Sequence, residues 1–254
     1  MNTFGNQRNI KLLISYKGTR YAGWQIQKNA VTVEGTVKAA IRNVTGEVVT
    51  VYGAGRTDAG VHAIGQTANF FTRSTIPAER FMPALNANLP ADIRVVQSEQ
   101  VSETFHSRFF AKGKIYSYRI DTGEVYDPLF CDMAWHLRYP INIDKMIEAS
   151  QCLIGKHDFR CFMASGSAVK DTVRTLHAID IEKEGRFIIL TFRGDGFLYH
   201  MVRIIVGTLC EIGMGMRDVD DMPSILVSRN RLNAGKTAPA KGLVMEKVIY
   251  EPDN

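Results

Sequence analysis

The feature that most constrains the fold is an order of expected elements that occurs twice along the 254-residue chain. Strands are indicated by β-rich apolar runs, and helices by apolar residues at helical spacing. In the first half these patterns predict, in order, a strand at 10–18, a helix at 31–46, strands at 47–53 and 65–72, a helix at 77–89 and a strand at 92–101.

The second half is expected to repeat this order. The patterns predict a strand at 112–121, a helix at 142–155, a hairpin at 171–194 that turns at Glu184–Gly185, a helix that starts near Phe197 and a closing strand at 242–251. We also expect a short helix within 216–230 and an irregular polar connection after Gly155.

A split β-α-β pattern that occurs twice favours an α/β (α+β) fold of two ferredoxin-like halves. We assign these halves to residues 1–105 and 106–254. Their antiparallel sheets are expected to join, and a basic cleft between the halves would be a common place for a site.

The composition excludes several classes of protein. A hydrophobic fraction of 45% and a charged fraction of 22% are those of an ordinary globular protein. No apolar run approaches the roughly 18 residues of a membrane span, and the N-terminal stretch MNTFGNQRNIK has no apolar signal core. The four cysteines are scattered, without C-x-x-C spacing, which disfavours a zinc site or disulfides and predicts reduced thiols in the cytoplasm.

The distribution of charge suggests a polyanionic partner. The formal net charge is +5, and basic residues outnumber acidic ones in the first quarter of the chain. A second basic cluster, from Arg108 to Arg119, is interleaved with Phe110, Tyr116 and Tyr118. Such clusters can be solvated faces, but aromatic rings among cations favour nucleic acid, because bases stack on them.

The stretch GAGRTDAGVHA, residues 53–63, predicts a glycine-rich loop with an acid at its tip. Glycines allow a tight turn and the close approach of a large ligand. Arg56 and Asp58 stand two residues apart, so their side chains point the same way on an extended chain.

The stretch GFLYHMVRIIVGTLCEIG, residues 196–213, is apolar nearly all round and should form a buried helix. Arg203 lies in its middle, and a buried guanidinium needs a carboxylate partner. A purely structural ion pair is one reading. The other is a pair with Asp58, which would hold that carboxylate ionised and aimed as a nucleophile.

Other chemistries fit the sequence less well. The loop matches neither G-x-G-x-x-G nor G-x-x-x-x-G-K-[ST], so nucleotide-phosphate binding has weak support. Asp58 and His62 could share a metal, but no third ligand follows at a suitable spacing. There is no G-x-S-x-G elbow for a serine hydrolase, and a glycosidase would need two carboxylates.

The loop sequence resembles the catalytic motif of the tRNA pseudouridine synthase A family. Four further stretches resemble other motifs of that family in the same order, and the resemblance spans roughly residues 10–250. They are SYKGTRYAGWQIQ, FHSRFFAKGKIYSYRI, GDGFLYHMVRIIVGTL and APAKGLVMEKVIY.

The resemblance implies an isomerase that converts uridine to pseudouridine at positions 38, 39 and 40 of the tRNA anticodon stem-loop, without cofactor or metal. By the same resemblance, Asp58 would be the nucleophile and Arg203 its partner, and Tyr116 would stack on the target base. Arg56 would help to displace the base from its stack, and Leu243 would line the base pocket.

The resemblance also implies a homodimer that binds tRNA across both subunits. Lys17 and Arg20, together with the cluster from Arg108 to Arg119, are expected to bind phosphates of the anticodon arm. We expect structural roles for His106 and His200. Two alternatives remain: a tRNA-binding module without catalysis, and a pseudouridine synthase with another RNA target.

Overall fold

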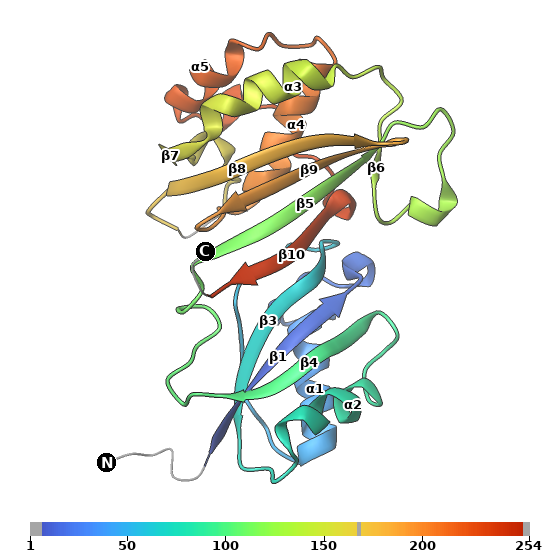
Figure 1. Cartoon of the computed structure of the whole chain (residues 1–254), viewed down its shortest axis with the longest axis vertical. Coiled ribbons are helices and arrows are strands. Elements are labelled where there is room, and N and C mark those ends of the chain that lie inside the picture. The colour runs from blue at the N-terminus through green and yellow to red at the C-terminus, as the bar shows by residue number, and fades with distance from the viewer. Residues whose placement is uncertain (1–6, 167–168, 251–254) are drawn as a thin grey trace. The chain divides into compact units, whose positions relative to one another are not determined.

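The computed structural model describes residues 7–166 and 169–250 and has a mixed α/β fold with mostly antiparallel strands (Figure 1). Its first elements are β1 (Arg8–Tyr16), α1 (Val33–Thr45), β2 (Val51–Gly53), β3 (His62–Thr72), α2 (Phe81–Asn86) and β4 (Ile93–Val101). They are followed by β5 (Gly113–Asp121), β6 (Trp135–His136), α3 (Ile143–Ser150), β7 (Gly155–Asp158), β8 (Val173–Glu184), β9 (Phe187–Gly194), α4 (Met201–Gly213), α5 (Asp221–Ser228) and β10 (Leu243–Ile249).

The chain divides into two compact units whose limits differ from the expected halves. The first unit consists of two segments, the chain up to Lys112 and the chain from Met245 onward. The second unit is Gly113–Val244. Residues 106–112 belong to the first unit because they bond to the end of the chain there: Lys112 N donates to the Ile249 carbonyl oxygen at 2.7 Å. The joining of the sheets and the basic cleft stay predictions.

In the first unit, β1 lies between β3 and β4 and pairs antiparallel with both. The expected helix at α1 is confirmed, and both its ends follow capping rules. The Thr32 side chain accepts a hydrogen bond from Gly35 N, and Gly46 ends the helix in the left-handed conformation at φ 76°. Its buried positions, Val33, Val37 and Ile41 among them, recur every four residues.

Two elements of the first unit are shorter than expected. Regular pairing of β2 starts only at Val51, opposite Phe70 of β3, rather than at residue 47. The helix expected at 77–89 is a 3-10 turn at Ala78–Arg80 followed by α2, in which Pro83 is accommodated in the first turn. Within residues 7–166 and 169–250, no helix has the length and apolar character that crossing a membrane would require.

In the second unit the strands lie in the order β5-β9-β8-β7, with β6 added parallel to β5. The hairpin of β8 and β9 and the short helix α5 confirm the prediction. The irregular connection expected after Gly155 is wrong for its first four residues, because β7 pairs with β8 there, with Gly155 opposite Leu176. Between β7 and β8 the described residues form a 3-10 turn at Arg160–Phe162 and otherwise irregular chain, as expected. The start of α4 is also wrong by several residues: His200 adopts φ 60°, so the helix begins only at Met201.

Candidate active site

The loop between β2 and β3 presents Asp58 at its turn, and its backbone is bonded on both sides of that residue. Gln66 donates from Nε2 to the Gly55 carbonyl oxygen at 2.8 Å. Val61 N donates to the Asp58 carbonyl oxygen at 3.1 Å. The half-buried Asp58 side chain therefore extends from a backbone that is held in place.

The residue before Asp58 is clamped by the segment between β1 and α1. Trp24 N donates to the Thr57 carbonyl oxygen at 3.1 Å. The Thr57 hydroxyl lies 2.7 Å from the Tyr16 hydroxyl, and both side chains are buried. Burial raises the pKa of Tyr16 far above its usual range, so that hydroxyl stays protonated and the contact persists at any physiological pH.

We call the contacts of Thr57 with Tyr16 and Trp24 the clamp. The sequence did not predict it. Thr57 stands inside the loop motif and Tyr16 at the end of a predicted strand, but nothing in the sequence shows that they touch. Gly23 completes the clamp: it adopts φ 90°, and a Cβ atom there would collide with the Thr57 carbonyl oxygen. The Asp58 position thus depends on residues 34–42 positions earlier in the chain.

His62 has a structural role in the same region. It is buried, and its Nδ1 accepts a hydrogen bond from Gly18 N at 3.0 Å. That bond ties the start of β3 to the 3-10 turn Gly18–Arg20 that follows β1. No three His, Cys, Asp or Glu side chains come together as a metal site would require within the described part of the chain.

The expected RNA-binding cations of the first unit differ in their surroundings. Arg56 and Lys17 are exposed. Arg20 is 71% exposed, but its Nη2 lies 2.7 Å from the Asp92 carboxylate. Burial alone would raise the pKa of Asp92, yet hydrogen bonds from Tyr21 and Arg20 outweigh it and lower that pKa. The charge of Arg20 is therefore partly offset by an ionised partner.

The second unit contains Tyr116, Arg203 and Leu243. Tyr116 lies on β5, is only 7% exposed, and meets the edge of Phe197 at 5.1 Å between ring centroids. Leu243 is buried at the start of β10. Whether they lie near Asp58, which belongs to the first unit, stays a prediction.

The buried character expected for α4 is confirmed, but Arg203 itself is half-buried rather than buried. Its Nε donates to the Ala238 carbonyl oxygen at 2.8 Å, and Ala238 N donates to the Arg203 carbonyl oxygen at 3.0 Å. The irregular chain at Ala238 thus lies along α4 and fixes the direction of the guanidinium. The pairing of Arg203 with Asp58 stays a prediction.

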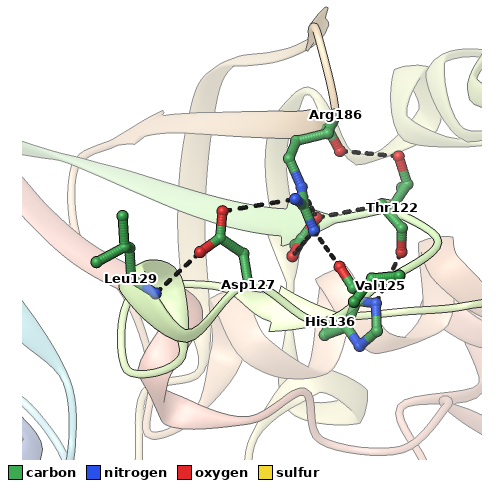
Figure 2. A network of polar contacts seen from close by, with 8 residues as sticks. Thr122, Val125, Asp127, Leu129, His136 and Arg186 are labelled. Atoms are coloured by element: carbon green, nitrogen blue, oxygen red, sulfur yellow. Dashed lines mark hydrogen bonds and ion pairs between the residues drawn. The ribbon is translucent and has the colours of Figure 1, made fainter.

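Asp121 and Arg186 form an ion pair in this unit that has a structural role. Asp121 is 3% exposed on its side chain and receives two hydrogen bonds from Arg186, from Nε at 2.6 Å and from Nη2 at 2.8 Å. Figure 2 shows Arg186 also reaching the Val125 carbonyl and Asp127, so it holds the loop after β5. Burial would raise the pKa of Asp121, but Arg186 and the Gly123 N–H lower it. With all its bonds internal, the ion pair fastens a loop.

A comparison with known families settles what kind of protein this is. A family model described as tRNA pseudouridine synthase matches residues 12–109 and 149–251. The chain belongs to the tRNA pseudouridine synthase family. It is therefore an isomerase that acts on tRNA, and the expected family and enzyme class are confirmed.

Several relatives are similar over nearly the whole chain. Proteins called tRNA pseudouridine synthase A from Acetivibrio thermocellus and from Thermoanaerobacter sp. are 48% and 49% identical over 243 residues, covering 96% of this chain and 100% of each relative. A Clostridium tetani protein called tRNA pseudouridine synthase A 2 is 46% identical over 245 residues, covering 96% of this chain and 99% of that protein. A chain in the crystal structure of a Cbf5-Nop10-Gar1 complex matches with a TM-score of 0.36 and 14% identity over 92% of this chain and 57% of that chain, too weakly to support an argument.

Proposed function

We propose that the enzyme isomerises uridine to pseudouridine at positions 38, 39 and 40 in the anticodon stem-loop of tRNA, with Asp58 as the nucleophile. The observation that supports this most is the fixed position of the loop that presents Asp58. Thr57, the residue before Asp58, is hydrogen-bonded to Trp24 and Tyr16. A nucleophile gains from such fixed positioning, because a reacting atom held at the right distance replaces an unfavourable encounter.

The proposed reaction balances without a co-reactant. The Asp58 carboxylate attacks either C1′ of the ribose or C6 of the uracil, and the bond between N1 and C1′ breaks. The uracil then turns, C5 forms the new bond to C1′, C5 gives up its proton and N1 gains one, and the bond to Asp58 is released. Because the product is an isomer of the substrate, we propose no cofactor and no metal.

We propose supporting roles for four further residues. The Arg203 guanidinium, aimed by its bond to Ala238, would pair with the Asp58 carboxylate. The Tyr116 ring would stack on the target uracil, and Leu243 would line its pocket. The exposed Arg56 side chain would help to displace the target base from its stack, a step that chemistry on a stacked base requires.

We also propose that the enzyme works as a homodimer in the cytoplasm and binds tRNA through cations at its surface. Lys17 is exposed and suited to a phosphate contact. Arg20 is also proposed to contact phosphate, and Asp92 offsets part of its charge. Binding of this kind weakens as salt rises, since each phosphate contact releases counterions.

The test is the variant Asp58→Asn, which keeps the side-chain shape but removes the nucleophilic charge. Pseudouridine at positions 38, 39 and 40 should vanish, while the melting temperature and tRNA affinity stay near the parent values. Asp220→Asn, at an exposed acid directly before α5, is the matched control and should retain activity. Activity of Asp58→Asn within tenfold of the parent would remove Asp58 from the mechanism.

Mapping of the product distinguishes the two alternatives. A wild-type protein that binds tRNA but forms no pseudouridine would be a binding module. Pseudouridine formed only outside the anticodon stem-loop would indicate a synthase with another target. In either case the proposal of positions 38, 39 and 40 is wrong.

A further inference from the structure

Three aromatic rings of the first unit form a continuous group that ends at the surface. The rings of Tyr52 and His106 lie 4.9 Å apart between centroids, and those of His106 and Phe109 lie 4.3 Å apart. Phe109, at the outer end, is 75% exposed. We call Tyr52, His106 and Phe109 the aromatic platform.

Buried hydrogen bonds fix the platform to the sheet. Tyr52 of β2 stands directly opposite Asn69 of β3. The Asn69 Oδ1 accepts from both the backbone N–H and the hydroxyl of Ser107, at 2.9 and 2.6 Å. The Tyr250 hydroxyl donates to the Ser107 carbonyl oxygen at 2.8 Å. Ser107 lies between His106 and Phe109 in the chain, so this anchor places His106 against Tyr52 and Phe109 against His106.

The surroundings of the middle ring favour its neutral form. His106 Nδ1 accepts a hydrogen bond from Arg108 N at 3.1 Å, which fixes the ring against the turn. Burial, together with the charge of Arg108, lowers the pKa of His106. A neutral imidazole packs against Phe109 without adding a charge to the platform, so the exposed ring has a rigid aromatic backing.

The position of the platform relates it to the catalytic loop within the same unit. Tyr52 is followed by Gly53, the last residue of β2, where the loop bearing Asp58 begins. Arg108 and Lys112, on the same segment as Phe109, are exposed cations, and Glu103 is the one acid between residues 102 and 112. An exposed aromatic face beside cations matches the chemistry of a nucleotide, with a flat base and a charged phosphate.

We propose that the aromatic platform stacks an unpaired nucleobase of the tRNA, through Phe109, while Arg108 and Lys112 face the flanking phosphates. The proposal rests on the proposed function and adds a second base contact, apart from the target uridine assigned to Tyr116. It accounts for two features that packing leaves unexplained, namely the large exposed area of Phe109 and its rigid attachment. An unpaired base rather than a helix is the ligand, because only an unstacked base offers its face.

The experiment compares tRNA affinity of the wild type with Phe109→Ala, Phe109→Leu and Phe109→Trp. Loss of a base–aromatic stack should weaken binding about 5- to 150-fold in the Ala variant. Leu keeps the apolar area but loses the ring face, so it should also bind weakly, and Trp should bind like the wild type. Val48→Ala shortens another exposed apolar side chain of the same unit and should leave tRNA affinity unchanged.

A scan with abasic nucleotides identifies the stacked base. At one unpaired position of the tRNA, removal of the base should weaken binding to the wild type but have little further effect on Phe109→Ala. Phe109→Ala or Phe109→Leu binding like the wild type would overturn the proposal, as would additive effects at every abasic position. A change in oligomeric mass of Phe109→Ala would assign the ring to a protein interface instead and also overturn it.

The outcomes separate the platform from the proposed function. If the wild type makes no pseudouridine in the anticodon stem-loop, the proposed function fails, whatever Phe109 does. If the wild type is active there and the Phe109 series binds uniformly, only the platform proposal fails.

Discussion

A methyl group at Gly23 should disable the enzyme without unfolding it, although Gly23 is 35 positions before Asp58. Two separate effects are expected from Gly23→Ala. The backbone adopts φ 90°, where a residue with a Cβ atom costs about 1–2 kcal/mol. The new Cβ would also lie far inside the 3.4–4 Å of ordinary contact to the Thr57 carbonyl oxygen, and 3.1 Å from the Asp58 carbonyl carbon.

The collision is with backbone, which cannot rotate away as a flexible side chain can. The Thr57 carbonyl must therefore move, and with it the bond that it accepts from Trp24 N. Overpacking of this kind costs about 1–3 kcal/mol. A displacement of about 1 Å at a reacting group lowers the rate about 100-fold, which is the loss we expect in pseudouridine formation.

Gly46→Ala is the matched control for this prediction. Gly46 adopts φ 76°, close to that of Gly23, but a Cβ atom there would meet nothing within 4 Å. It should lower the free energy of unfolding by about 1–2 kcal/mol and leave the turnover of folded enzyme unchanged. Both variants are compared by single-turnover pseudouridine formation and by urea unfolding. If Gly23→Ala turns over as fast as Gly46→Ala, the clamp does not position Asp58.

The remaining predictions concern stacking on the target base, the salt dependence of tRNA binding and the loss of stability at low pH. If the Tyr116 ring only stacks on the base, Tyr116→Phe should keep most activity and Tyr116→Ala should lose it. Loss of activity in both variants would assign a proton transfer to the hydroxyl. Steady-state rates of pseudouridine formation distinguish the two. Lys17→Ala should weaken tRNA binding and make tRNA affinity less dependent on salt concentration, and an unchanged salt dependence would contradict this. Arg56→Ala should keep tRNA binding but lose turnover, and normal turnover would contradict that. Arg186→Ala should lower the free energy of unfolding at neutral pH, because it leaves the buried Asp121 carboxylate without its cation. Because the folded-state pKa of Asp121 is lowered, this stabilisation is present above the unfolded pKa and lost as the pH falls through the folded one, so urea unfolding should show the two proteins converging in acid.

The order of elements could be predicted because each has its own periodic apolar pattern. Where prediction failed, the cause was not visible in the apolar pattern. β7 is a strand because β8 offers it an edge, and the four residues Gly155–Asp158 have no strand pattern of their own. α4 starts late because His200 takes a left-handed conformation that non-glycine residues seldom adopt. Arg203 was expected to be buried because its neighbours are apolar, but it is half-buried, and the carbonyl oxygen of the distant Ala238 accepts a hydrogen bond from its Nε.

The candidate site shows the same division between local and distant information. The glycines around Asp58 predict a loop tip, but they leave open what holds it still. Tyr16, Gly23 and Trp24 supply that hold from the stretch that ends β1 and leads into α1. Two motifs more than 30 residues apart in the sequence thus form one structure, in which the first fixes the backbone and the second presents the carboxylate. A substitution in the first motif should therefore act on turnover even though none of its residues needs to touch the reacting uridine.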